Sequence, residues 1–203
     1  MTHVWITSVD GSRNLRPPLD HPTAEAIANA ESVDSELKPA MGVLLTRLEA
    51  DHQASESIIR RKWLFGSLMI ELVHPIAVKH GVDVRWIHRA AYTFASPYLT
   101  ISKRTDRIGS DEISLCVILA ATPWEKLSGK ELRWADWWSI LEAPNLRRDV
   151  RLVNLVADAA QNGRSRNVRS VVTAFRNHFK NWDTTHLSDE ELGQVVKSIQ
   201  TGQ

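Results

Sequence analysis

The chain has 203 residues, of which 43% are hydrophobic and 24% charged, and its formal net charge is +1. These totals are ordinary for a globular protein with a sizeable core, and they exclude a chain that is basic throughout. The charge is unevenly distributed, because residues 1–56 carry four Lys and Arg against nine Asp and Glu, whereas residues 147–180 carry eight against two. This asymmetry predicts a nucleic-acid surface or an electrostatic partner for the second segment.

A single cysteine, Cys116, lies in the apolar run "ISLCVILAA". It has no partner in the chain for a disulfide, and the pattern predicts a buried thiol in a reducing compartment. The first residues lack the basic start and apolar run of a signal peptide, and no apolar segment reaches the ~20 residues of a membrane span. We therefore expect a cytoplasmic protein that does not enter a membrane.

The N-terminal quarter is expected to be an acidic, partly irregular region over 1–54. Three prolines mark a loop within 1–22, and apolar spacing predicts separate helices over 24–32 and 38–52, the second with Pro39 in its first turn. The rest, 55–203, is expected to form a helical core.

The strongest helical segment is 55–81, where apolar residues recur at helical spacing from Ile59 to Ile76. Ser55 or Ser57 is expected to cap its start, and Gly81 to end it. Pro75 removes one backbone donor, so we expect a kink or break near Leu72. A further helix is predicted over 84–96, capped by Asp83 and ended by Pro97.

The remaining elements alternate with polar breaks. The dense apolar run 112–122 fits either a buried strand or a buried helix, since periodicity does not separate the two. Helices are predicted over 132–144, 148–162, 167–180 and 187–200, the last opened by a capping box of Ser188 and Glu191. The expected fold class is mainly α: a multi-helix single domain with one or two helix-turn-helix-like units, and one short strand if 112–122 is extended.

The segment 148–180 has the outline of a helix-turn-helix: a helix, a short turn with Gly163, and an amphipathic helix. The second helix would point polar side chains outward, where Arg pairs with guanine edges and Asn with adenine edges. Arg164 and Arg166 precede it and would contact phosphates. The predicted contacts within the helix are Arg169, Ser170, Thr173, Arg176, Asn177 and Lys180.

The alternative interpretation is an ordinary solvated helix, because any surface helix of an all-α protein has a polar face. Short glycine turns between helices are also common outside DNA-binding proteins. The predominance of Arg and the local charge excess favour DNA binding. A secondary candidate lies on 84–96, where Arg85, His88 and Arg89 are expected to face outward and approach a DNA backbone; for this helix a structural role is favoured.

A resemblance covers residues 132–175, about a fifth of the chain. This segment resembles a recurring segment of bacterial plasmid and phage proteins, including ParB-like partition proteins. There, a Leu–small–Trp helix start precedes a break, a helix ending in an "x-N-G" turn, and a helix opened by "S-x-R-x-L/V". The matching positions here are Leu132, Trp134, Pro144, Asn162, Gly163, Arg166 and Val168. The Trp137-Trp138 pair departs from the pattern, and no partition-type nucleotide motif is present. The resemblance implies a helical DNA-binding protein of a mobile element.

Signals of catalysis are weak. The chain lacks a phosphate-binding glycine loop and a G-x-S-x-G motif, and His74, His80 and His88 are spaced too widely for a zinc site on one helix. We therefore expect no enzyme, no cofactor and no metal.

The sequence thus favours a DNA-binding regulator or maintenance protein of a bacterial plasmid, phage or mobile element, acting on double-stranded DNA. Palindromic sites would require a homodimer. The alternative is a helical protein-interaction subunit of a larger assembly without direct DNA contact.

Overall fold

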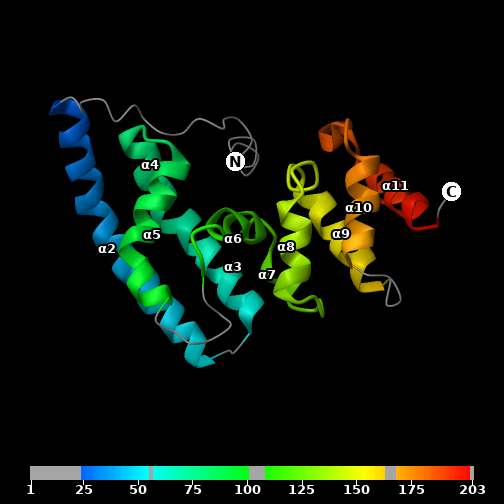
Figure 1. Cartoon of the computed structure of the whole chain (residues 1–203), viewed down its shortest axis with the longest axis horizontal. Helices are drawn as coiled ribbons and strands as arrows, with labels where there is room; N and C mark the ends of the chain where they lie inside the picture. The colour runs from blue at the N-terminus through cyan, green and yellow to red at the C-terminus, as the bar shows by residue number, and fades with distance from the viewer. Residues whose placement is uncertain (1–23, 55–56, 101–107, 163–167, 202–203) are drawn as a thin grey trace. The chain divides into compact units, whose positions relative to one another are not determined.

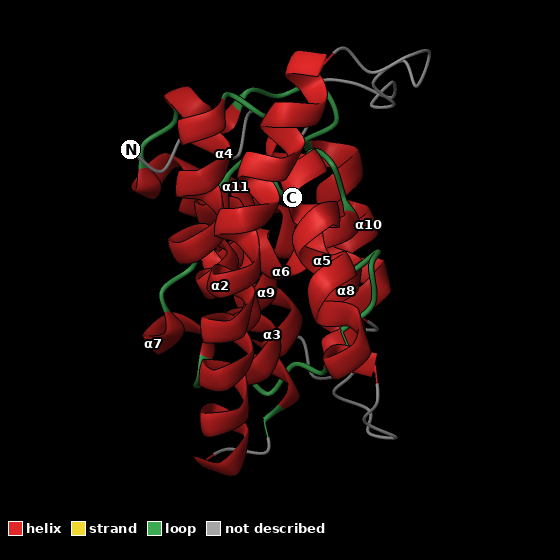
Figure 2. Cartoon of the chain, turned by 90° about the vertical axis from the view of Figure 1, so that its left-hand side faces the viewer, coloured by secondary structure: helices red, strands yellow, loops and turns green. Residues whose placement is uncertain are grey.

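A computed structural model of the chain describes residues 24–54, 57–100, 108–162 and 168–201. All regular secondary structure in these ranges is helical, which confirms the mainly α fold class (Figure 2). The described residues divide into two compact units, here called the N-terminal unit, which ends at Val117, and the C-terminal unit, which begins at Ile118. The predicted irregular segment 1–22 lies outside the described residues.

The N-terminal unit is built around one long helix. Its elements are α2 (Ala24–Ala54), α3 (Ile58–Leu68), the π-helix η2 (Met69–Val73), α4 (His74–His80), α5 (Val84–Thr100) and the start of α6 (Ile113–Ala120). Helix α2 lies along both α5 and the continuous rod formed by α3, η2 and α4 (Figure 1). Its buried stripe, Val33, Leu37, Met41, Leu44 and Leu48, faces these partners.

The prediction of two separate helices over 24–32 and 38–52 was wrong, because α2 continues through Pro39. Pro39 is exposed, so water can satisfy the carbonyl that loses its helical donor, while Leu37 and Met41 remain buried on either side. Pro97 is likewise exposed, and α5 passes through it to Thr100 instead of ending at residue 96.

Where a kink or break was expected near Leu72, the chain forms a π-helix and stays helical through Pro75. The N–H of His74 donates to the carbonyl of Met69, five residues back, and the widened turn immediately precedes Pro75. Ser57 caps α3, and Gly81 ends α4 with a left-handed φ of 61°. The N–H groups of Arg85 and Trp86 donate to the Asp83 carboxylate, as a capping residue requires.

The run 112–122 forms a helix, α6, so the strand alternative was wrong. Nearly every side chain from Ile113 to Leu119 is buried, and a helix that is apolar all round is a helix enclosed by its neighbours. Gly66 of α3 permits this enclosure, since a Cβ at Gly66 would lie 1.9 Å from the carbonyl oxygen of Cys116.

The C-terminal unit is a helical cluster. Its elements are α7 (Trp124–Leu127), α8 (Trp134–Glu142), α9 (Val150–Asn162), α10 (Val168–His178), the 3₁₀ turn η3 (Thr184–His186) and α11 (Asp189–Thr201). Helix α10 packs against α8, α9 and α11 (Figure 1). The capping box at the start of α11 is confirmed: the N–H of Ser188 donates to the Glu191 carboxylate, and the N–H of Glu191 to the Ser188 hydroxyl.

Candidate nucleic-acid interface

Helix α10 has a sharply divided surface. Val171, Val172, Phe175 and, just beyond the helix, Phe179 are all less than a tenth exposed. They recur at spacings of three and four residues, so they form one stripe that packs on the neighbouring helices. Burial of this stripe therefore leaves the rest of the surface of α10 exposed.

All the predicted contact residues that lie on α10 or directly after it are exposed. They are Arg169, Ser170, Thr173, Arg176, Asn177 and Lys180. Arg169 and Arg176, seven residues apart, fall on one line along the helix, and Lys180 lies in the turn that follows it. Arg169 and Arg176 are thus about 10 Å apart along the helix axis, at 1.5 Å per residue. Phosphates of one DNA strand follow one another at about 3.4 Å along the duplex axis, so a row of this length can reach more than one of them.

Two of these cations, Arg176 and Lys180, form no ion pair with another residue in the described part of the chain. Their donors therefore face solvent. Thr173 differs, because its hydroxyl donates to the carbonyl of Arg169 at 2.8 Å, which leaves it an acceptor and a methyl group on the surface. Arg164 and Arg166, predicted to contact phosphates, lie outside the described residues, as does the turn with Gly163.

The end of α10 is fixed from outside the helix. The side-chain amide of Asn145, in the connection between α8 and α9, donates to the carbonyl of Arg176 at 2.7 Å. Carbonyls in the last turn of a helix lack an internal donor, so this bond both satisfies the backbone and sets the direction in which α10 ends.

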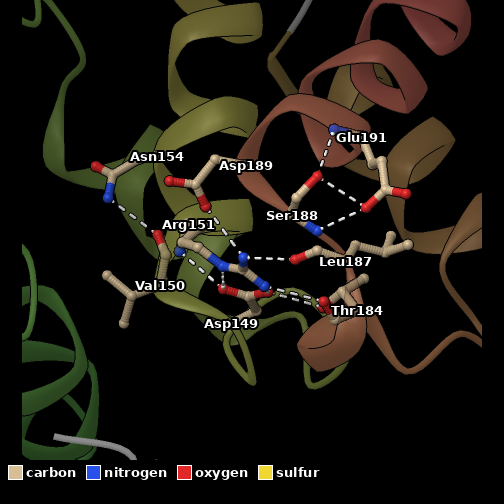
Figure 3. Close-up of polar contacts among 9 residues, drawn as sticks. All are labelled: Asp149, Val150, Arg151, Asn154, Thr184, Leu187, Ser188, Asp189 and Glu191. Atoms are coloured by element: carbon tan, nitrogen blue, oxygen red, sulfur yellow. Dashed lines mark hydrogen bonds and ion pairs between the residues drawn. The ribbon is translucent and has the colours of Figure 1, made fainter.

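A network around Arg151 joins the start of α9 to the segment that follows α10 (Figure 3). The guanidinium of Arg151 donates to both oxygens of Asp149, at 3.1 and 2.8 Å, and to Asp189 at 3.0 Å. It also donates to the carbonyls of Thr184 and Leu187. Thus Arg151, counted in the basic segment, is a structural residue whose charge is used inside the unit.

Asp149 is the other half of this network, and it is 8% exposed. Burial opposes its ionisation, but the hydrogen bonds from Arg151 and from the Thr184 hydroxyl outweigh burial and lower the pKa of Asp149 below its ordinary value. Its carboxylate also accepts from the N–H of Arg151, which caps α9. Sequence reasoning missed this network, although the "DVR" start of α9 carried the capping signal.

The secondary candidate on α5 is only partly placed as predicted. Arg89 is exposed and Arg85 is partly exposed, but His88 is 7% exposed and points inward, so its assignment to a DNA contact was wrong. Its Nε2 lies 2.7 Å from Nε2 of His74, and the two rings stack with centroids 4.9 Å apart. Burial lowers the pKa of His74 to about 4 and, together with the proximity of His74, lowers that of His88 to about 3.

The N-terminal unit holds a second buried polar pair. Lys62, 1% exposed, donates from Nζ to Oε2 of Glu112 at 2.5 Å, and the N–H of Gly109 donates to the same oxygen. Burial also raises the pKa of the nearby Cys116 thiol, which keeps it protonated and a poor nucleophile. These contacts are those of structural residues that neutralise one another.

Other classes of site find little support in the described ranges. No three His, Cys, Asp or Glu side chains there are grouped to hold a metal ion. Likewise, none of the described helices combines the length and the apolar character that crossing a membrane requires.

Comparisons with known proteins returned no match: no family model, no curated protein and no solved structure is similar to this chain.

Proposed function

We propose that the chain is a non-enzymatic DNA-binding protein that contacts double-stranded DNA through the outward side of α10. The observation that carries the proposal is the row of exposed cations, of which Arg176 and Lys180 are not neutralised by any described residue. Because phosphate contacts release condensed counterions, such a row would provide affinity that falls steeply with salt.

The same side of α10 offers groups that can distinguish bases. Asn177 is exposed, and an Asn amide can donate to N7 of adenine and accept from its N6 amino group in the major groove. Arg169 and Arg176 can pair with guanine or with phosphates. The proposed role is that of a regulator or maintenance protein of a plasmid, phage or mobile element, as the resemblance of 132–175 implies. A palindromic target would be bound by a homodimer.

The test is a titration of labelled duplex DNA at about 50 mM and about 200 mM salt. The wild type is compared with the Arg169→Ala/Arg176→Ala variant and with a Lys126→Ala/Lys197→Ala variant. The second variant removes the same charge from exposed positions on α7 and α11. We expect steeply salt-dependent binding by the wild type and a slope of log K against log salt that is lower by about 2 in the α10 variant alone.

Equal losses in both variants would show that net charge, and not α10, governs binding. Absence of wild-type binding at low salt would exclude the DNA-binding role and favour the alternative, a protein-interaction subunit. Circular dichroism of each variant confirms that the fold is retained.

A further inference from the structure

Trp182 lies four residues beyond the end of α10. It is 50% exposed, and among the described residues of the C-terminal unit it is the most exposed large hydrophobic one. A tryptophan in this position exposes a broad π-face, which water solvates poorly and flat partners contact well.

The ring is held in place by two other rings. Its centroid lies 5.9 Å from that of Phe179, edge to face at 87°, and 5.3 Å from that of His178, at 51°. Phe179 is 1% exposed and anchored in the core, so the orientation of Trp182 is fixed from below. The backbone N–H of Trp182 also donates to the carbonyl of Phe179, which closes a tight turn. The exposed ring is therefore organised before any partner arrives.

The neighbours of Trp182 indicate what the ring would bind. Lys180 and Asn181 are exposed in the same turn, and Arg176 lies one helical turn before Lys180. The acid that follows Trp182 in sequence, Asp183, lies 3.5 Å from His186. A flat aromatic surface beside cations is the combination with which proteins bind exposed nucleobases and their phosphates.

Resting on the proposed function, we propose that Trp182 is a stacking site for an unpaired DNA base, and that the chain prefers a duplex with a single-stranded extension to a blunt duplex. The reason is geometric, since both π-faces of a base inside a continuous duplex are covered by its neighbours. Only an unpaired or flipped base can present a face to Trp182 while α10 contacts the duplex beside it.

The experiment compares three DNAs with the same duplex: blunt, with a short thymine extension, and with an extension of equal length made of abasic sites. Both strand polarities are used. The abasic extension keeps the phosphates and removes the bases, so it separates stacking from charge. The full chain and its Trp182→Ala, Trp182→Phe and Lys180→Ala variants are titrated by fluorescence anisotropy.

For the wild type we expect binding to the thymine extension about tenfold tighter than to the abasic one, because a base stacked on an aromatic ring contributes to affinity on this scale. Trp182→Ala should abolish this difference and leave binding to the blunt duplex unchanged. Trp182→Phe should retain part of the difference, and it also reports if the alanine variant fails to fold. Lys180→Ala should weaken binding to all three DNAs alike.

Equal wild-type affinity for the thymine and abasic extensions would overturn the stacking site while leaving the proposed function intact. A Trp182→Ala loss that is the same for blunt and extended DNA would also overturn it, because the ring would then contact the duplex or support the fold. Failure of the wild type to bind any of the three would sink the proposed function and the stacking site together.

Discussion

The buried pair of His74 and His88 predicts that the protein is destabilised in mild acid. The side chains are 3% and 7% exposed, and the 2.7 Å distance between their Nε2 atoms is a hydrogen bond that needs one ring as donor and the other as acceptor. Two protonated rings could not form this bond and would repel each other. The geometry therefore excludes double protonation, and burial disfavours even a single charge on the pair.

The two pKa values determine whether the protein gains or loses stability as the pH falls. Burial lowers the pKa of His74 to about 4, and burial with the proximity of His74 lowers that of His88 to about 3, whereas an unfolded histidine titrates near 6.5. Since the unfolded chain binds more protons in this window, the free energy of unfolding is highest above pH ~6.5 and falls as the pH drops toward ~4. At about pH 5.5 the unfolded form of each histidine gains about 1.4 kcal/mol from protonation, or about 3 kcal/mol for the pair.

The measurement is urea unfolding at about pH 7.5 and about pH 5.5, for the wild type and for a His74→Leu/His88→Leu variant of similar side-chain volume. The wild type should lose about 3 kcal/mol more than the variant on acidification. Carboxylates with a lowered pKa, such as Asp149, lose their contribution at lower pH, so this window isolates the histidines. An equal loss in wild type and variant would refute the neutral, buried state of the pair.

Three further predictions concern packing, the Arg151 network and base recognition. Gly66→Ala should destabilise the fold by about 2–3 kcal/mol in urea unfolding, because its Cβ would lie 1.9 Å from a backbone oxygen of α6, whereas Gly42→Ala, into open space on α2, should stabilise it by about 0.5–1 kcal/mol. Arg151→Met should cost roughly 2 kcal/mol, less than the ~3–5 kcal/mol of a fully buried pair because the Arg151 side chain is 35% exposed, and adding Asp149→Asn should recover part of the loss. Asn177→Ala should relax the preference among duplexes that differ at one base pair and leave the salt slope unchanged, and titrations against base-substituted duplexes check this.

Sequence periodicity predicted the amphipathic helices of the C-terminal unit. The elements α9, α10 and α11 all lie within two residues of their predicted ranges. It failed where tertiary packing outweighed a local signal. Pro39 predicts a helix start from its own chemistry, but the stripe that continues on both sides is buried in the unit, and this burial keeps α2 continuous.

The prediction that His88 faces outward was wrong for a related reason. A histidine between two arginines reads as part of a polar face, and its burial depends on His74, fourteen residues earlier on α4. The turn that places His74 correctly is the π-helix before Pro75, which shifts the register of all following side chains. A periodicity analysis that assumes a regular α-helix therefore does not predict a contact between residues on either side of a π-helix.

A count of charged residues in the basic segment does not show which charges are exposed. Residues 147–180 hold eight Lys and Arg, but Arg151 forms ion pairs with Asp149 and Asp189. Asp189 lies outside the segment, so the count had not included it. What singles out α10 is therefore the position of its cations rather than their number. Arg176 and Lys180 flank the stripe formed by Phe175 and Phe179, and both cations stay exposed while the stripe is buried. The same hydrophobic burial that stabilises the unit thus determines which charges remain available to a partner.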